Sequence, residues 1–344
     1  MRYINVILIT VLLGFFLTMG CDTVTDSSIE NQMLSEHEIT ATANVTISGY
    51  GIVKSSQQEF SDSGYAGWST PSGTVVASGG FQFTQLLSSA STSAPAKPES
   101  EWPHHTFGPE EYGWVVQKNS DGSGSSGFVY NVHIDELAGY EIVYSPELTF
   151  SDGGWAGWSC PEGKVVLGGG FDADGSVKAS APAKPDSEWP HYTFGADEYG
   201  WVVQSAEPIN GSVYAICADE PDGYEIFESN PITFSTTGWG GWSVPEGGLI
   251  LGGGFVSESP VMTSAPAGPD SEWPHYTFGP EEYGWVVQSA GGGLTTINAI
   301  GVVAEVDQEQ PEDRRPAFVR DCDDYETLGY RNRGQCVRDN NPGR

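Results

Sequence analysis

One unit is written three times in this chain, and this repetition restricts the possible folds more than any other feature. The copies begin at the Gly-Tyr pairs at 49–50, 139–140 and 223–224. Each copy then runs through a Gly- and Trp-rich stretch, a Gly-rich apolar run and a closing apolar run. In the second copy these are GWAGWSCPEG (154–163), KVVLGGGF (164–171) and GSVYAICADE (211–220). Three copies of one unit predict three homologous structural modules within residues 49–306.

Each unit has the sequence pattern of β-structure. In YEIVYS (140–145) large apolar side chains recur at every second position, which is the period of a half-buried strand. The other apolar runs are short and bounded by Gly, Pro, Asp or Ser, so we expect four or five strands per unit and no helix longer than a turn. Glycines inside GGGF indicate a bulge, or a place where another backbone or ring comes close.

The segments outside the repeats have different characters. The predicted organisation is a lipoprotein-type signal peptide (1–20), a flexible tether (21–48), three β repeats (49–138, 139–222 and 223–306), a charged linker (307–319) and a C-terminal disulfide motif (320–344).

The N-terminal segment predicts export. MRYINVILITVLLGFFLTMGC has a basic residue, an apolar run that is short for a membrane span, and a small residue before Cys21. It resembles a bacterial lipoprotein signal, which implies lipidation of Cys21 and anchoring to a bacterial membrane or cell surface. Plain secretion is the alternative.

The cysteines fit an exported chain. If Cys21 carries lipid, four cysteines remain for two pairs. Cys160 aligns with Thr70 and Val244 of the other copies, and Cys217 aligns with His133 and Gly301, so both cysteines are absent together. This paired loss predicts the disulfides Cys160–Cys217 and Cys322–Cys336.

The charge balance excludes one class of partner. The chain has 46 acidic against 14 basic residues and a net charge of −32, which repels phosphate backbones, so we expect no nucleic acid partner. Such a surface keeps a protein soluble. Calcium at the carboxylates is a weaker interpretation, because no EF-hand spacing is present, and we expect no cofactor.

Two resemblances suggest an architecture. CPEGKVVLGGGF and YAICADE, in the second unit, resemble tandem repeats of secreted bacterial proteins. GWAGWSCPEG (154–163), GWGGWSVPEG (238–247) and TTINAI (295–300) are loosely similar to the vitelline membrane outer layer protein family. That resemblance implies a β-prism of three Greek-key sheets with pseudo-threefold symmetry, one sheet per repeat. CDDYETLGYRNRGQCVR (322–338) resembles a Cys-bounded motif at the ends of microbial secreted proteins. None of these resemblances brings catalytic residues.

The prism also makes physical sense, because a single four-stranded sheet buries its apolar face poorly on its own. We therefore expect an all-β fold of three homologous Greek-key-like sheets, with three tandem small β-sandwiches as the alternative. The paired rings Trp155/Trp158, with their counterparts Trp239/Trp242 and Tyr65/Trp68, are expected to fill the centre.

One segment is repeated far more faithfully than the rest. From SAPA to WVVQ (93–117, 180–204 and 264–288) any two copies differ at only three or four of 25 positions. Its prolines predict a long ordered loop before the strand GWVVQ, and such loops are often functional. One interpretation is structural: the aromatic residues pack the loop onto its sheet, as we expect for Trp114, Trp201 and Trp285.

The other interpretation is a binding surface, in which rings stack on sugars and carboxylates accept hydrogen bonds from hydroxyls. The candidate residues are Trp102, His104, Glu110 and Glu111 in the first copy, Trp189, His191, Tyr192, Asp197 and Glu198 in the second, and Trp273, His275, Tyr276, Glu281 and Glu282 in the third.

These residues predict a non-catalytic envelope protein that binds a polysaccharide or extracellular matrix. A structural or adhesive scaffold is the first alternative. A polysaccharide-acting enzyme using the paired carboxylates is the second, disfavoured because adjacent turn residues rarely face one bond. A metal held by His104, His191 and His275 is weaker still, and the oligomeric state is not predicted.

Overall fold

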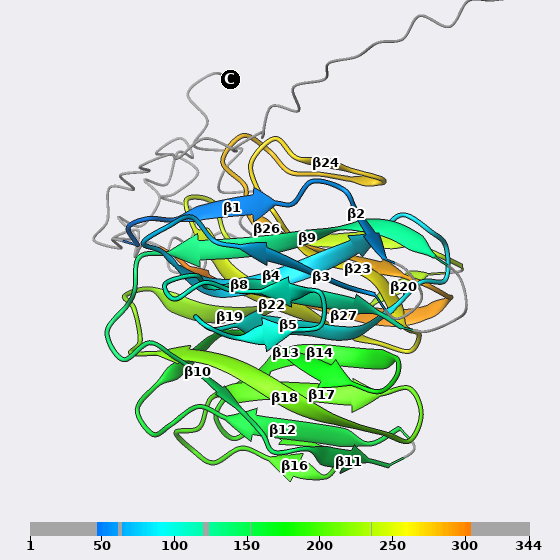
Figure 1. Cartoon of the computed structure of the whole chain (residues 1–344), viewed down its shortest axis with the longest axis horizontal. Helices are drawn as coiled ribbons and strands as arrows, with labels where there is room; N and C mark the ends of the chain where they lie inside the picture. Colours follow the sequence, from blue (N-terminus) through cyan, green and yellow to red (C-terminus); the bar gives the residue numbers. More distant parts are fainter. Residues whose placement is uncertain (1–46, 61–63, 120–123, 152, 235, 304–344) are drawn as a thin grey trace, which may run out of the picture. The chain divides into compact units, whose positions relative to one another are not determined.

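The computed structural model describes residues 47–60, 64–119, 124–151, 153–234 and 236–303. Cys21, the signal peptide, the linker and the Cys322–Cys336 pair lie outside these residues. All regular structure in the described residues is β-strand, which confirms the all-β prediction (Figure 1). Within them, no helix is long and apolar enough to cross a membrane.

Each repeat contributes nine strands, more than the four or five expected, because several have only two or three residues. The first repeat forms β1 (Gly51–Lys54), β2 (Gln58–Phe60), β3 (Tyr65–Ser69), β4 (Val75–Phe83), β5 (Ala90–Ala96), β6 (Glu101–Trp102), β7 (His105–Thr106), β8 (Gly113–Lys118) and β9 (Ser125–Ile134). The second forms β10 (Glu141–Tyr144), β11 (Leu148–Phe150), β12 (Trp155–Ser159), β13 (Val165–Ala173), β14 (Val177–Ala183), β15 (Glu188–Trp189), β16 (Tyr192–Thr193), β17 (Gly200–Ser205) and β18 (Ile209–Ala218). The third forms β19 (Tyr224–Glu228), β20 (Ile232–Phe234), β21 (Trp239–Ser243), β22 (Leu249–Ser257), β23 (Val261–Ala267), β24 (Glu272–Trp273), β25 (Tyr276–Thr277), β26 (Gly284–Ser289) and β27 (Gly293–Val302).

The strands form three seven-stranded antiparallel sheets, and each sheet is shared between two repeats. Sheet 1 has the order β1-β9-β4-β23-β26-β21, with β2 also on β9. Sheet 2 has the order β10-β18-β13-β5-β8-β3, with β11 on β18, and sheet 3 the order β12-β17-β14-β22-β27-β19, with β20 on β27. Every repeat thus gives four strands to one sheet and three to another. The first repeat shares sheet 2 with the second, the second shares sheet 3 with the third, and the third shares sheet 1 with the first.

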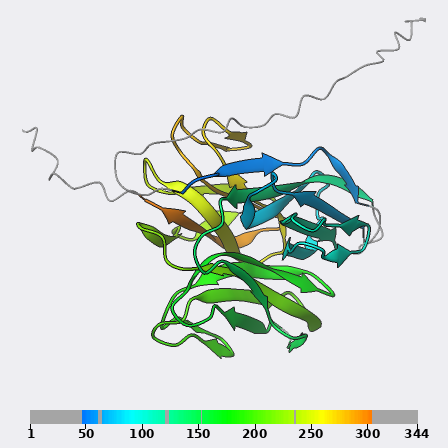
Figure 2. The same ribbon diagram turned by 60° about the vertical axis from the view of Figure 1, so that its left-hand side comes forward.

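This exchange corrects the expectation of one sheet per repeat, while the three-sheet arrangement is confirmed. Cyan β5 of the first repeat lies beside green β13 of the second in Figure 1, where the two are hydrogen-bonded neighbours. In Figure 2 the blue-to-teal, green and yellow-to-orange strands meet in the middle of the described part. Because the strands exchange in a closed circuit, tandem independent sandwiches are excluded.

The Gly-rich run of each unit explains how the sheets meet. Central strands β4, β13 and β22 contact one another, and each has a bulge in its pairing at the start of that run. A Cβ on Gly168 would collide with the carbonyl oxygen of Ala77, a Cβ on Gly169 with the indole of Trp201, and a Cβ on Gly170 with the carbonyl oxygen of Ser93. Successive glycines therefore admit a neighbouring central strand, a core ring and the strand of another repeat, as the sequence indicated.

The main core is filled by tryptophans of the strand GWVVQ. Trp114, Trp201 and Trp285 are almost fully buried, and their Nε1 atoms each donate to a serine hydroxyl at 2.9 Å. The two rings of each GWxGW pair do not fill the centre together: Trp158, like Trp68 and Trp242, packs against the main core, whereas Trp155 packs with the hairpin cluster of Phe194. Trp155 and Trp158 are three residues apart on one strand, so they point to opposite sides of the sheet and both stay half-buried.

The disulfide Cys160–Cys217 is present, with its Cα atoms 5.7 Å apart. It closes a loop of 57 residues, which stabilises the fold by about 4 kcal/mol in the chain-entropy model. A Cβ on Gly301 would lie 2.8 Å from the side chain of Val244, so the equivalent positions also touch in the third repeat. The two positions that lose their cysteines together in the other repeats are therefore in contact in the structure.

Candidate functional site

The faithfully repeated segment folds as a strand, a small hairpin and a second strand. In the first copy these are β5, the hairpin β6–β7, and β8. The hairpin turn is Pro103-His104, and His104 has a φ of 67°. A proline followed by a residue with positive φ is the combination of a type II turn, and His191 and His275 repeat it at 73° and 69°. These three histidines are exposed at the hairpin tips.

Each hairpin lies on the side of its sheet that faces away from the main core. In the first copy Phe107 is buried against Ala94, Ala96 and Val115, with Trp102 packed at the edge of this cluster. The other copies form equivalent clusters around Phe194 and Phe278. The small residues of SAPA are needed because larger side chains would occupy the space of the hairpin rings. The structural interpretation of the segment is therefore correct for Phe107 and its counterparts.

The residue after the turn histidine also packs inward. The rings of Tyr192 and Tyr276 lie over Gly157 and Gly241, where a Cβ would come within 2.6 Å of them. The hydroxyl of Tyr192 shares a hydrogen bond of 3.2 Å with that of Ser159, and Tyr276 repeats it with Ser243 at 3.3 Å. These two candidate rings are only partly available to a ligand.

The paired carboxylates divide into two roles. Glu111 accepts a hydrogen bond of 2.8 Å from the backbone N–H of Gly108, and Glu198 and Glu282 make the same contact within their own turns. Their neighbours are exposed: Glu110, Asp197 and Glu281. One member of each pair thus holds the turn. Among the described residues, no group of three His, Cys, Asp or Glu side chains is placed to hold a metal ion.

The three hairpin tryptophans are half-buried, and each contacts a ring of the same repeat. Trp189 lies 4.7 Å from Trp155, Trp273 lies 5.6 Å from Trp239, and Trp102 lies 6.2 Å from Tyr65, measured between ring centroids. The Nε1 atoms of Trp189 and Trp273 are buried and have no hydrogen-bond partner. Any contact of these two indoles with a ligand is therefore through ring carbons.

A second wall beside each hairpin comes from the following repeat, because the sheets are shared. Trp102 of the first repeat lies 6.4 Å from Tyr214 of the second, and Trp273 of the third lies 6.0 Å from Tyr130 of the first. We call these surfaces face 1 (around Trp273, sheet 1), face 2 (around Trp102, sheet 2) and face 3 (around Trp189, sheet 3).

Strand register shows what the faces share and where they differ. In every face, the half formed by the hairpin's own repeat has an aromatic residue paired with a glutamine. These pairs are Trp239 and Gln288 on face 1, Tyr65 and Gln117 on face 2, and Trp155 and Gln204 on face 3. The half from the next repeat varies: Gln82, Phe128, Tyr130 and Lys54 on face 1, Asp172, Ser212, Tyr214 and Tyr144 on face 2, Val256, Thr296, Asn298 and Glu228 on face 3.

Face 2 carries the longest row of rings. Tyr65, Trp102, Tyr214 and Tyr144 follow one another, with neighbouring centroids 6.2, 6.4 and 5.4 Å apart. Tyr144 is stacked on Tyr214 at 26° and is 54% exposed. On face 1 the corresponding place is occupied by Lys54, whose ammonium lies 3.8 Å from the ring centroid of Phe128.

A carboxylate lies within the row of face 2. Asp172 accepts a hydrogen bond of 2.7 Å from the hydroxyl of Thr92, across the junction between two repeats. Burial raises the pKa of the Asp172 carboxyl above its usual value, the hydrogen bond from Thr92 opposes this rise, and Asp174 adds to it. The carboxylate charge is close enough to raise the pKa of Tyr214 as well, although burial is the larger cause there.

Face 3 has a cavity at the positions that hold Asp172 and Ser212 on face 2. This cavity of about 400 Å³ lies over the variable half and is lined by Gln204, Val256 and Leu294 among others. The three faces thus have the same hairpin and different neighbouring surfaces.

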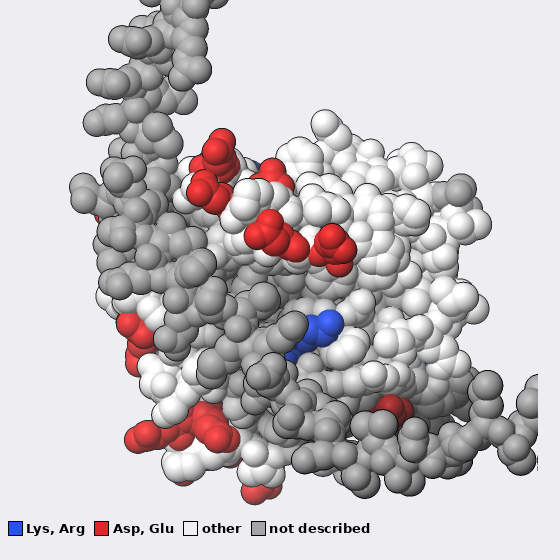
Figure 3. All heavy atoms as spheres, turned by 90° about the horizontal axis from the view of Figure 1, so that it is seen from above, with Lys and Arg blue, Asp and Glu red and all other residues white. Residues whose placement is uncertain are grey.

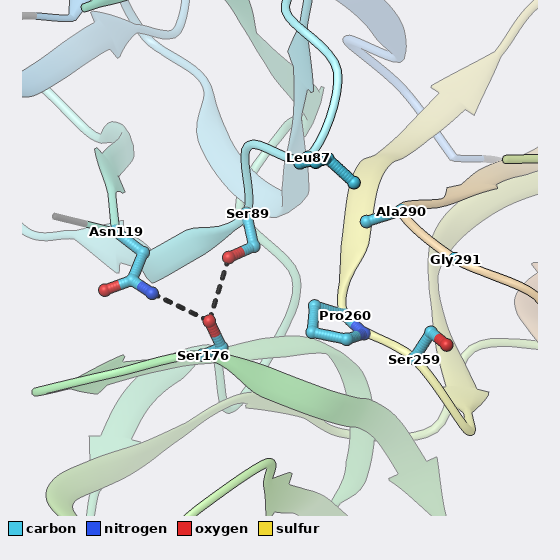
Figure 4. Close-up of a pocket in the computed structure, with 8 residues that line it drawn as sticks. All are labelled: Leu87, Ser89, Asn119, Ser176, Ser259, Pro260, Ala290 and Gly291. Atoms are coloured by element: carbon cyan, nitrogen blue, oxygen red, sulfur yellow. Dashed lines mark hydrogen bonds between the residues drawn. The ribbon is translucent and has the colours of Figure 1, made fainter. Parts of the chain in front are cut away.

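A further cavity of about 230 Å³ lies where loops of all three repeats converge (Figure 4). One side is polar: the hydroxyl of Ser176 accepts from Asn119 at 2.7 Å and shares a bond of 2.9 Å with Ser89. The other side includes Leu87, which is 70% exposed and has a φ of 69°. A positive φ is unusual for leucine.

Sequence reasoning found the hairpins but missed the walls beside them. Tyr144, Tyr214 and Asp172 lie in the next repeat, and no local pattern distinguishes them from other strand residues. Internal alignment gives a weak signal, since Asp172 stands where the other repeats have Gln82 and Val256. Neither models of known protein families nor curated proteins give a match to this chain.

Proposed function

We propose that this chain is an exported, non-catalytic protein that binds a glycan or extracellular matrix through its three hairpin faces. The lipid on Cys21 would anchor it to a bacterial membrane or cell surface. The supporting observation is that each hairpin tryptophan is held by rings of its own repeat while part of it remains exposed. A fixed apolar ring beside hydrogen-bonding groups suits a sugar, which presents both C–H faces and hydroxyls.

Surface charge narrows the glycan class. Carboxylates outnumber basic side chains on the face seen in Figure 3, and the whole chain has a net charge of −32. Such a field disfavours polyanionic sugars, so neutral glycans are the better ligands. Three faces on one chain would add avidity on a polymer, because the second and third contacts become intramolecular.

A structural or adhesive scaffold is the second candidate. It is favoured by the packing of Phe107, Tyr192 and Glu198, which hold the segment in place without any ligand. The packing of the segment onto its sheet thus explains part of the near identity of its three copies. The two candidates differ in whether the exposed rings contact a sugar.

The deciding experiment measures binding of the purified full-length protein to a panel of neutral and acidic polysaccharides. A triple variant, Trp102→Phe, Trp189→Phe and Trp273→Phe, keeps an aromatic ring in each hairpin but reduces the stacking area. We expect weaker binding, by about tenfold on a polymer, with an unchanged circular dichroism spectrum. Leu86→Ala is the matched control, because Leu86 is 64% exposed and belongs to none of the three faces.

No binding to any polysaccharide in the panel would leave the scaffold as the function. Cleavage of a polysaccharide that is abolished by changing Glu110, Asp197 and Glu281 to the corresponding amides would instead point to an enzyme.

A further inference from the structure

We propose that face 2 is the principal glycan-binding face and that it takes consecutive sugar rings of a neutral linear polysaccharide. This inference rests on the proposed function and adds which face binds, and which residues of the following repeat determine it. The hairpins differ at one position, where His105 replaces Tyr192 and Tyr276, and the ring beside the hairpin is Tyr65 on face 2 instead of tryptophan. Most of the difference among the faces therefore comes from the strands of the following repeat.

The first argument is the length of the apolar surface. On face 2 the rings of Trp102, Tyr214 and Tyr144 continue from the hairpin across strands β18 and β10, and the last ring is exposed over more than half its surface. On face 3 the positions of Tyr214 and Tyr144 hold Asn298 and Glu228, which are paired in the same register. Face 3 therefore has no ring in that half on which a second sugar could stack.

The second argument is the position of the polar groups. Asp172 lies in the same cross-strand row as Gln117 and Thr92, beside the row of rings. The amide oxygen of Gln117 already accepts from the hydroxyls of Ser91 and Thr92, at 3.0 and 3.1 Å. The carboxylate of Asp172, which uses Oδ1 for the bond from Thr92, is therefore the group that can accept hydrogen bonds from sugar hydroxyls while the rings contact C–H groups. Face 1 has Gln82 in place of Asp172, and its amide oxygen already accepts a hydrogen bond of 2.8 Å from the hydroxyl of Tyr130.

The third argument excludes a polyanion as occupant. Lys54 on face 1 lies against Phe128, and burial lowers its pKa. On face 2 the ammonium of Lys97 lies 5.2 Å from the ring centroid of Tyr144, and the carboxylate of Asp172 lies in the cross-strand row opposite Thr92. A uronic acid polymer would bring its charges against Asp172, whereas a neutral polymer meets no such repulsion.

The test is titration calorimetry of the full-length protein with hexasaccharides of cellulose, chitin, mannan and laminarin, and with hexagalacturonate as the acidic probe. We expect one tight site per chain for a neutral hexasaccharide. Tyr144→Ala should weaken that site about tenfold, and Asp172→Asn should weaken it by a smaller factor. Leu86→Ala is again the control, since Leu86 is 64% exposed and belongs to none of the three faces.

A gain of binding provides a second, independent readout. Transferring the wall of face 2 to face 3 requires Val256→Asp, Asn298→Tyr and Glu228→Tyr. Gly254 pairs with Asn298 just as Gly170 pairs with Tyr214, so the grafted tyrosine has the same room. We expect a second tight site per chain in this variant.

The outcomes separate the two proposals. Three equal sites, or an affinity that changes less than twofold in both Tyr144→Ala and Asp172→Asn, would overturn the assignment of face 2 and leave glycan binding intact. Preference for hexagalacturonate would overturn the neutral class. If none of the hexasaccharides binds, the proposed function fails, and this inference fails with it.

Discussion

At the scale of the residue, the hairpin histidines show how a candidate site residue can have a conformational role. His104, His191 and His275 all adopt a φ near +70°, following a proline. Only glycine adopts that conformation without steric cost, and histidine is among the side chains that tolerate it best. Their side chains are exposed and can also contact a ligand, so a substitution is needed that separates the conformational role from ligand contact.

Replacing His191 by glycine should keep or slightly raise the free energy of unfolding, whereas valine should lower it by about 1–2 kcal/mol. The reason is that a β-branched side chain clashes with the backbone at positive φ. Urea denaturation measures the difference. If glycine also abolishes polysaccharide binding while stability is kept, the imidazole contacts the ligand. Equal stability of the glycine and valine variants would contradict the turn assigned here.

At the scale of the element, the Gly-rich strand is where the repeats are joined. Gly170 lies where β13 meets β5, and Gly254 where β22 meets β14. A Cβ at Gly254 would collide with the carbonyl oxygen of Ser180, which belongs to another repeat. The strand can relieve this collision only by moving away from its partner.

Gly254→Ala should therefore lower the free energy of unfolding by roughly 2–4 kcal/mol, in the upper range for point mutations. Gly268→Ala is the control, because its nearest atom would lie 3.7 Å away and the other repeats carry lysine there. Thermal unfolding followed by circular dichroism compares the two. A loss no larger in Gly254→Ala than in the control would show that the junction adapts.

The sequence predicted strands well and their partners poorly. Alternation in 140–145 and the turns around KVVLGGGF are local signals, and the structure has β10 and β13 there. Which sheet a strand joins depends on contacts between distant segments, such as Phe171 with Ser93, which local periodicity does not encode. For the same reason Trp102 was found as a candidate, and Tyr214 beside it was not.

At the scale of the whole molecule, tyrosines at the start of each repeat tie it to the one before. The hydroxyl of Tyr140 donates to the carbonyl oxygen of Val76 at 2.8 Å, and that of Tyr224 to Val166 at 2.7 Å. Tyr50 takes the equivalent place, at 5.4 Å from the ring of Tyr283. Part of each ring is exposed, but the hydroxyls are enclosed, and burial raises the pKa of all three.

These tyrosines should make the protein labile to alkali. A folded-state pKa above the unfolded value means that their stabilisation is complete below about pH 10. It is lost as pH rises further, by about 1.4 kcal/mol per pH unit for each tyrosine. Urea midpoints between pH 8 and pH 12 measure this slope. Tyr140→Phe should reduce the slope by the contribution of one tyrosine, about 1.4 kcal/mol per pH unit, and lower stability at pH 7 by about 1 kcal/mol. A midpoint that does not change above pH 10 would contradict the enclosure of these hydroxyls.

Closure of the strand exchange also fixes the copy number. In an open array, recombination can add or remove a unit, because each unit needs only its neighbour. Here the last unit completes a sheet begun by the first, with β23 beside β4. A gene with two or four units would have to re-form every junction at a different angle. Length variation in this lineage is thus expected in the loops between strands, and not in the number of repeats.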